Sequence, residues 1–157
     1  FYCAALHLTS LTGSPASVQG NFVCSKNKLI SLVGGPTSVS KHYRCSHNRL
    51  QTLEGAPAFV GGDFDCGVNL FTSLKGIHTH LKEVRGMISL NWCNIESHML
   101  GLLKIKGLRE ISYTRMIQGG IPEEVGLIIN KHLAADRNIL VCQEELIDAG
   151  FEKYAQL

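Results

Sequence analysis

Apolar and polar residues along the first half of the chain recur with a period of 21 residues. Each of three blocks carries an aromatic residue, a cysteine two positions later and an asparagine three positions after that; the blocks are Phe22–Leu29, Tyr43–Leu50 and Phe64–Phe71. The alternation of apolar and polar residues at the start of each block predicts a short strand with one buried face. A fixed period with apolar residues at constant offsets is typical of a stacked repeat.

A second signature of Leu, Gly, Pro and Val follows each block. It reads Leu32, Gly34, Pro36 and Val39, then Leu53, Gly55, Pro57 and Val60, and more weakly Leu74, Gly76, His78 and Leu81. An earlier copy reads Phe1, Cys3, Leu8, Leu11, Gly13, Pro15 and Val18. Because Gly and Pro interrupt regular structure, each unit is predicted to be one strand with a returning loop. One unit buries too little apolar surface to offset its conformational entropy, so the units must stack to fold.

One phase of the repeat carries Asn27, Asn48 and Asn69. An inward asparagine donates and accepts hydrogen bonds at once, so a column of them could satisfy backbone groups of the loops. The alternative is that these residues form turns and tolerate positive φ.

Four of the six cysteines, Cys3, Cys24, Cys45 and Cys66, share one inward phase. There a cysteine acts as a small buried apolar residue. Cysteines paired in register on parallel strands rarely reach the torsion of a disulfide bond, so we expect no disulfide framework. No Cys-x-x-Cys spacing occurs, so we expect neither a redox motif nor a zinc ribbon. A column of free thiols is typical of a reducing cytoplasm.

The repeat pattern, Val-x-x-x-Phe-x-Cys-x-x-Asn-x-Leu-x-x-Leu-x-Gly-x-Pro, resembles a short leucine-rich repeat. It is similar to the short repeats of secreted bacterial effectors. It is closer to a group of uncharacterised tailed-bacteriophage proteins, whose units read much like Leu53 to Pro57 followed by Gly61 to Cys66. The resemblance covers residues 1 to about 84. It implies an α/β repeat fold, a leucine-rich-repeat-like solenoid of short parallel strands, and binding to another macromolecule without catalysis.

From Val84 onward the 21-residue phase is lost. Counting by 21 places Arg85 at the aromatic position, Met87 at the cysteine position and Leu90 at the asparagine position. Val84 to Ile95 are therefore interpreted as a degenerate fifth unit whose register can slip. We therefore predict regular units over residues 1–84, a degenerate part of the solenoid over residues 85–117 and a helical cap over residues 118–157.

The cap is predicted to hold two helices after a break at Gln118, Gly119 and Gly120. In the first, Pro122 suits the first turn, and an apolar stripe runs along Val125, Ile128, Ile129, His132 and Leu133. In the second, Asn138 is a candidate N-cap, Gly150 ends the helix, and Ile139, Cys142, Leu146 and Ala149 share a face. Before the break we expect a short helical turn within Glu96 to Leu103 and two short strands around Lys106 and Gly107. The two helices of the cap would cover the apolar flank and the open edge of the last turn of the solenoid. The alternative is that their acidic face is a second docking surface.

Overall charge gives little reason to expect an anionic partner. The chain has 15 Lys and Arg and 13 Asp and Glu, a net charge of +2, so we expect no nucleic acid and no membrane surface as partner. No apolar run reaches the length of a transmembrane helix. Phe1 falls on a strand position with no initiator Met, so we expect that the sequence starts inside a longer protein.

Catalytic motifs are missing from the sequence. There is no Gly-x-Ser-x-Gly, no phosphate-binding loop and no His-Glu-x-x-His, so we expect no enzyme, no cofactor and no metal. His78 and His80 would share a face in an extended segment, and with Cys93 or His98 they form the only weak zinc candidate. Cys93, beside the single Trp92, is interpreted as a core residue and not as a nucleophile.

The candidate binding residues point outward from the predicted strands, between the buried aromatic and cysteine residues. In register, Arg44 should lie beside Val23 and Asp65, and His42 beside Asp63. One interpretation is charge pairing on a solvated sheet. The other is a polar recognition strip, with Arg44 held by Asp65, because solenoids bind partners through such faces.

These patterns favour a non-catalytic interaction protein, encoded by a bacteriophage, that binds a host or phage protein in the bacterial cytoplasm. A virion-associated structural or assembly component is the first alternative. A binder of small ligands at the junction of repeats and cap, near Trp92, is the second.

Overall fold

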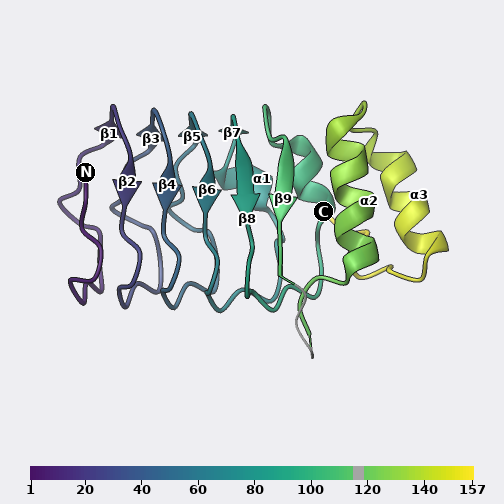
Figure 1. Ribbon diagram of the computed structural model, residues 1–157, viewed down its shortest axis with the longest axis horizontal. Helices are drawn as coiled ribbons and strands as arrows, with labels where there is room; N and C mark the ends of the chain where they lie inside the picture. Colours follow the sequence, from purple (N-terminus) through teal and green to yellow (C-terminus); the bar gives the residue numbers. More distant parts are fainter. Residues whose placement is uncertain (115–118) are drawn as a thin grey trace.

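The computed structural model describes residues 1–114 and 119–157. It shows a solenoid of short parallel strands followed by two helices that pack on its last strands (Figure 1). One sheet has the order β2-β4-β6-β8-β9, with β2 Phe22–Val23, β4 Tyr43–Arg44, β6 Phe64–Asp65, β8 Met87–Ser89 and β9 Glu110–Ser112. The other has the order β1-β3-β5-β7, with β1 Ser17–Val18, β3 Ser38–Val39, β5 Phe59–Val60 and β7 Glu83–Val84.

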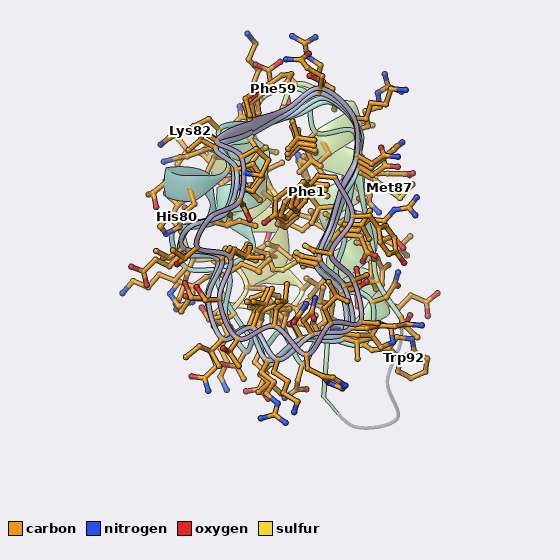
Figure 2. The ribbon with its side chains drawn as sticks, turned by 90° about the vertical axis from the view of Figure 1, so that its left-hand side faces the viewer. Phe1, Phe59, His80, Lys82, Met87 and Trp92 are labelled. Carbon is orange, nitrogen blue, oxygen red and sulfur yellow. The ribbon has the colours of Figure 1, made fainter. Side chains whose placement is uncertain are left out.

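The core of the solenoid is built from columns of identical positions. Phe22 lies opposite Tyr43, and Tyr43 opposite Phe64, which confirms the 21-residue register. Together with Phe1 these rings form a stack inside the coil, with successive centroids 5.4, 5.0 and 5.4 Å apart (Figure 2). The column of cysteines beside them is also confirmed, because all four thiols are buried and free.

The asparagine column forms the predicted hydrogen-bond ladder. Asn48 Nδ2 donates to the carbonyl oxygens of Cys24 at 3.1 Å and Cys45 at 3.0 Å, and its Oδ1 accepts from Leu29 N at 3.0 Å. Asn27 and Asn69 make the same contacts one turn away. The alternative of positive φ at asparagine is wrong, because positive φ belongs to the preceding residues Lys26, His47 and Val68.

The second sheet was not expected. The unit was predicted as one strand and a loop, but the returning segment contains a second strand that ends in a buried valine; these valines are Val18, Val39, Val60 and Val84. Each of these strands has only two residues. Each also buries a single residue, so this segment lacks the alternation that the buried aromatic and cysteine residues provide in the first sheet.

The register after the fourth turn differs from the predicted one. Val60 pairs with Val84 and Phe64 with Ile88, a spacing of 24 residues, because the short helix α1 (Ile77–His80) lengthens the return segment. Val84, not Leu81, therefore continues the valine column. The aromatic position is held by Ile88 instead of Arg85, the cysteine position by Leu90 instead of Met87, and the asparagine position by Cys93 instead of Leu90.

From here on, the turns are numbered by the strands of the five-stranded sheet. Turn 1 is residues 1–20, turn 2 is 21–41, turn 3 is 42–62, turn 4 is 63–86, turn 5 is 87–109, and turn 6 begins at 110. Turn 5 contains a 3-10 helix at Leu100–Lys104 and a single bridge between Glu83 and Lys106. The predicted helical turn is thus present, slightly later in the chain than expected. One of the two predicted strands is β9.

The two predicted cap helices are confirmed as α2 (Glu123–Ala134) and α3 (Ile139–Asp148). Asn138 caps α3, since its side chain accepts from Val141 N, and Gly150 follows the helix with φ +82. The predicted boundary between residues 117 and 118, and Gln118 in the predicted break, lie outside the described residues.

The cap satisfies the edge of the last strand. Asn130 of α2 accepts from Ile111 N at 2.7 Å and donates to Ile111 O at 3.0 Å, as a neighbouring strand would. The guanidinium of Arg137 donates to the carbonyl oxygens of Ile105 and Leu108. The open edge that the sequence predicted is thus covered by side chains of the cap.

Candidate functional site

The outer face of the five-stranded sheet carries the predicted binding residues. The pairing of β2, β4 and β6 places Val23 beside Arg44 and Arg44 beside Asp65, as expected. The same row continues through Ser89 and Ser112. In Figure 2, this face lies on the side of the coil where Met87 and Trp92 are labelled.

His42 and Asp63 lie together, but both serve the backbone of the solenoid. Their side chains approach to 3.2 Å, between Nδ1 and Oδ2. Asp63 N donates to His42 Nδ1 at 3.0 Å, and Asp63 Oδ1 accepts from Met87 N at 2.9 Å. These contacts join turn 3 to turn 4 and turn 4 to turn 5, so the two residues help to hold adjacent turns together.

Arg44 is not held by Asp65 as the sequence suggested. Asp65 Oδ1 instead accepts from Gly67 N at 3.1 Å, two residues further along its own strand. In the described part of the chain, the guanidinium of Arg44 makes no ion pair and no hydrogen bond, and the residue is exposed. Arg44 is therefore a free cation on the outer face.

Sequence reasoning missed the residues that surround Arg44. We define the basic corner as the exposed residues Lys26, Lys28, Arg44, His47 and Arg49, where the sheet bends into the loops of turns 2 and 3. Lys26 and His47 occupy the same phase of successive turns, and so do Lys28 and Arg49. Lys26 N bonds to Ser46 O at 2.9 Å and Arg49 N to Leu29 O at 2.9 Å, so the two turns are in direct contact here.

No acidic residue lies in the part of the chain that forms the basic corner. Residues 1–53 contain Lys26, Lys28, Lys41, Arg44 and Arg49 but no Asp or Glu, and the first acidic residue is Glu54. Among the described residues, none of the five side chains of the basic corner forms an ion pair. The signal was present in the sequence, but the net charge of +2 over the whole chain conceals it.

The far end of the same face carries hydroxyl and amide groups and one exposed carboxylate, Glu110 of β9. Asn91 Nδ2 donates to the hydroxyls of Ser89 at 2.9 Å and Ser112 at 3.0 Å, and Thr114 Oγ1 donates to Asn91 Oδ1 at 2.9 Å. Trp92 follows with φ +59 and an exposed fraction of 57%. The face thus changes from cationic at turns 2 and 3 to hydroxyl-rich with one exposed aromatic ring at turns 5 and 6.

Thiol chemistry is disfavoured by burial. Burial raises the pKa of Cys24 to about 12 and the pKa values of Cys93 and Cys142 to about 11. Cys93 is 2% exposed, so its interpretation as a core residue is confirmed. These thiols are inaccessible and protonated at neutral pH, which is the opposite of an activated nucleophile.

The histidines are not gathered into a site. His78 and His80 lie on the helix α1, not on an extended segment, and His98 Nδ1 contacts the hydroxyls of Ser73 and Ser97. Within residues 1–114 and 119–157, no three His, Cys, Asp or Glu side chains are close enough to hold a metal ion. His132 is a buried core residue, as predicted, and contacts Glu145 Oε2 at 2.8 Å.

The described helices are also too short or too polar to span a lipid bilayer. The geometry therefore leaves one extended polar face with a basic corner as the main candidate for binding. Comparisons of the chain with protein-family models, curated proteins and solved structures found no match.

Proposed function

We propose that this protein is a non-catalytic interaction protein that binds a protein partner through the outer face of the five-stranded sheet. The observation that supports this function is the basic corner, where exposed basic residues, Lys28 and Arg49 among them, lie in register on adjacent turns and, among the described residues, form no ion pair. Adjacent turns are about 4.8 Å apart, and like charges at that spacing repel each other. An acidic surface on a partner would relieve this repulsion, so the partner contributes Asp and Glu side chains.

The resemblance of the repeats to tailed-bacteriophage proteins supports a phage origin and a partner in the bacterial host cytoplasm. The leucine-rich-repeat-like pattern supports the same function, since such solenoids commonly bind macromolecules. A virion-associated structural or assembly component remains the second candidate, and a native-mass measurement distinguishes it by self-association of the purified chain.

The test is affinity capture from phage-infected cells with three baits. The first bait is the natural protein, and the second carries Lys28→Ser, Arg44→Ala and Arg49→Ser. The third is a matched control with Lys41→Ser, Lys104→Ser and Lys153→Ser, which removes the same charge elsewhere. We expect one protein to be captured by the first and third baits and lost by the second. Equal capture by all three would contradict the proposal.

Arg44→Ala alone is expected to weaken capture by about 2 kcal/mol, as for a binding hot spot, with little change in stability. Asp65→Ala should have a smaller effect, because Asp65 contacts Gly67 N and not Arg44. Binding can be measured by titration once the captured protein is purified. An unchanged affinity of the Arg44→Ala variant would exclude Arg44 from the interface.

A further inference from the structure

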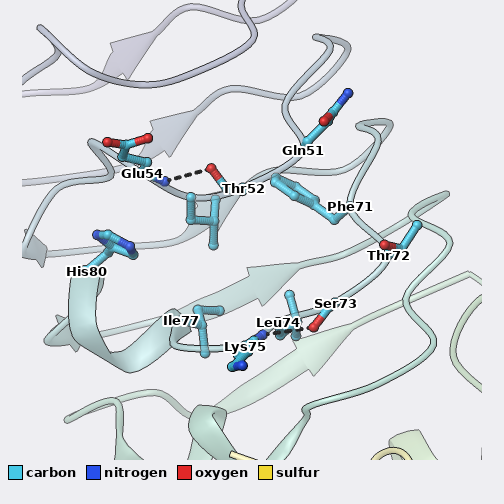
Figure 3. A pocket seen from close by; sticks show the side chains of 11 residues that line it. Gln51, Thr52, Glu54, Phe71, Thr72, Ser73, Leu74, Lys75, Ile77 and His80 are labelled. Atoms are coloured by element: carbon cyan, nitrogen blue, oxygen red, sulfur yellow. Dashed lines mark hydrogen bonds between the residues drawn. The ribbon is translucent and has the colours of Figure 1, made fainter.

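A cavity of about 410 Å³ lies between turns 3 and 4, on the return segment that includes the helix α1 (Figure 3). This volume falls in the range of small-molecule sites, which is about 300–1,000 Å³. The cavity is not at the junction of repeats and cap, and Trp92 is not part of its lining.

The cavity exists because the 24-residue turn separates two turns that would otherwise touch. A Cβ added at Gly34 would lie 2.9 Å from Thr12 N, and one added at Gly55 would lie 2.2 Å from Val33 N, so turns 1, 2 and 3 approach closely at this phase. A Cβ at Gly76, the next glycine of the column, would meet nothing closer than Thr79 of its own turn, at 3.6 Å.

One backbone hydrogen bond between turns 2 and 3 is also not repeated between turns 3 and 4. Leu32 N donates to Glu54 O at 3.0 Å and joins turn 2 to turn 3. In the described part of the chain, Leu53 N, one turn later, donates to no acceptor in turn 4. The close approach of neighbouring turns at Gly34 and Gly55 therefore ends at Gly76, and the cavity is a consequence of the inserted helix.

The floor of the cavity is apolar and belongs to the core. Leu53, Phe71, Leu74 and Ile77 line it, with exposed fractions of 6%, 1%, 3% and 2%. Such a floor fits an aromatic or branched aliphatic group, because only apolar contacts are offered there.

The rim carries unpaired polar groups at one end. Glu54 of turn 3 and His80 of α1 lie on opposite sides of that end (Figure 3). Among the described residues, neither side chain takes part in an ion pair. Lys75 extends from turn 4 on the other side of Ile77, away from Glu54 (Figure 3). The Glu54 end is thus complementary to a cationic group.

We propose that this cavity binds a small molecule that has one apolar group and one protonated amine. The apolar group packs on Phe71, Leu74 and Ile77. The amine donates to the Glu54 carboxylate and, when the imidazole is neutral, to a ring nitrogen of His80. This site is separate from the basic corner and does not depend on the function proposed for it.

The test compares three probes that share a phenyl group and differ in charge: 2-phenylethylamine, 2-phenylethanol and 3-phenylpropionate. NMR titration of the full chain follows the methyl groups of Leu53, Leu74 and Ile77. We expect shifts confined to these groups, with the amine bound about threefold more tightly than the alcohol and the carboxylate weakest. The modest ratio reflects the exposure of Glu54, since exposed charge pairs contribute little.

Two variants and a control complete the design. Glu54→Gln should lower the affinity for the amine to that for the alcohol, whereas Glu152→Gln, an exposed carboxylate in the cap, should change neither. Thr52→Trp, at an exposed rim position, should block all three probes without altering the core. Equal binding of amine and carboxylate, shifts outside the cavity, or full binding to the Thr52→Trp variant would each overturn the proposal.

Discussion

The interior turns 2 and 3 are stabilised by different contacts from those that stabilise the closing turns 5 and 6. In turns 2 and 3 each side chain lies against its counterpart from the next turn: Phe22 on Tyr43, Cys24 beside Cys45, Asn27 beside Asn48. In the closing turns the rings are replaced by Ile88 and Ile111, and the asparagine by Cys93.

The difference is clearest in the backbone groups that each column satisfies. Asn48 makes three hydrogen bonds to the backbone, whereas Cys93 offers one weak S–H contact to Cys66 O at 3.5 Å. Phe71 N, which would bond to an asparagine at position 93, has no acceptor among the described residues. At the closing end, side chains of the cap bond to backbone groups of the last turns: Asn130 bonds to Ile111 N and Ile111 O, and Arg137 bonds to Ile105 O. Repetition thus stabilises the interior turns, and a non-repeating element stabilises the end.

The largest effect is expected from removing that element. Deletion of residues 119–157 should expose the apolar flank around Leu103, Leu108 and Ile111 and leave Ile111 N and Ile111 O unpaired. We expect insoluble or aggregated protein, measured by size-exclusion chromatography and circular dichroism. A soluble truncation that melts cooperatively would mean that the helices serve binding and not stability.

The thiol column should make the repeats sensitive to alkaline pH. Burial raises the pKa of Cys24 from its ordinary 9.0 to about 12 and keeps the pKa of Cys45 well above 9.0. Because the folded state favours the protonated thiols, their contribution to stability is complete below pH 9 and is lost as the pH rises toward 12. Circular dichroism should show cooperative unfolding in this range, and native Cys24 and Cys45 should react with an alkylating reagent only there or in denaturant. Rapid alkylation at pH 8 would contradict the stacked core.

Removing one asparagine should lower the stability of the protein less than deleting the whole cap does, but more than changing any surface residue does. Asn48→Ala leaves Leu29 N without its partner in a buried loop and removes one of the two amide donors at the carbonyl oxygens of Cys24 and Cys45, which Asn27 and Asn69 still reach. We expect a loss of about 3 kcal/mol in the free energy of unfolding, measured by urea denaturation. Gln51→Ala, an exposed neighbour, serves as the control. A loss below about 1 kcal/mol would mean that water replaces the amide.

Introducing an asparagine at position 93 tests the same hydrogen bonds in the opposite direction, by gain instead of loss. Cys93→Asn places an amide where Phe71 N and Cys66 O can both reach it, on a loop that already has positive φ at Trp92, as the regular units have at Lys26 and His47. We expect stabilisation of about 1 kcal/mol by urea denaturation. Cys93→Ala, which offers no hydrogen bond, should be destabilising instead. Stabilisation by both variants would indicate a packing effect and not a hydrogen bond.

The sequence predicted the parts of the structure that repeat or that have clear end signals. The register of Phe22, Tyr43 and Phe64 followed from spacing alone, and Asn138 and Gly150 marked the ends of α3 because capping chemistry is local. A slip of register from Val84 was expected, but its size of three residues and its cause were not, because α1 is a single helical turn with no cap signal of its own. The cavity depends on that shift and was therefore also missed.

Side-chain pairing on the candidate face was only partly predictable. Register placed Arg44 beside Asp65, but the choice of Asp65 for the amide of Gly67 depends on local backbone geometry that spacing does not reveal. The basic corner required knowing that Lys28 and Arg49 lie on touching turns of a bend and not on a strand. Overall charge could not show it, because acidic residues are concentrated after Glu54.

The constant 21-residue register of turns 2 and 3 also bears on how such a molecule can evolve. Duplication or loss of 21 codons would add or remove one complete coil without disturbing the contacts of its neighbours. Each added copy would lengthen the row of cations by one strand spacing, about 4.8 Å. Variation in copy number would then tune the reach of the protein along an acidic target in equal steps, with the terminal helices left unchanged.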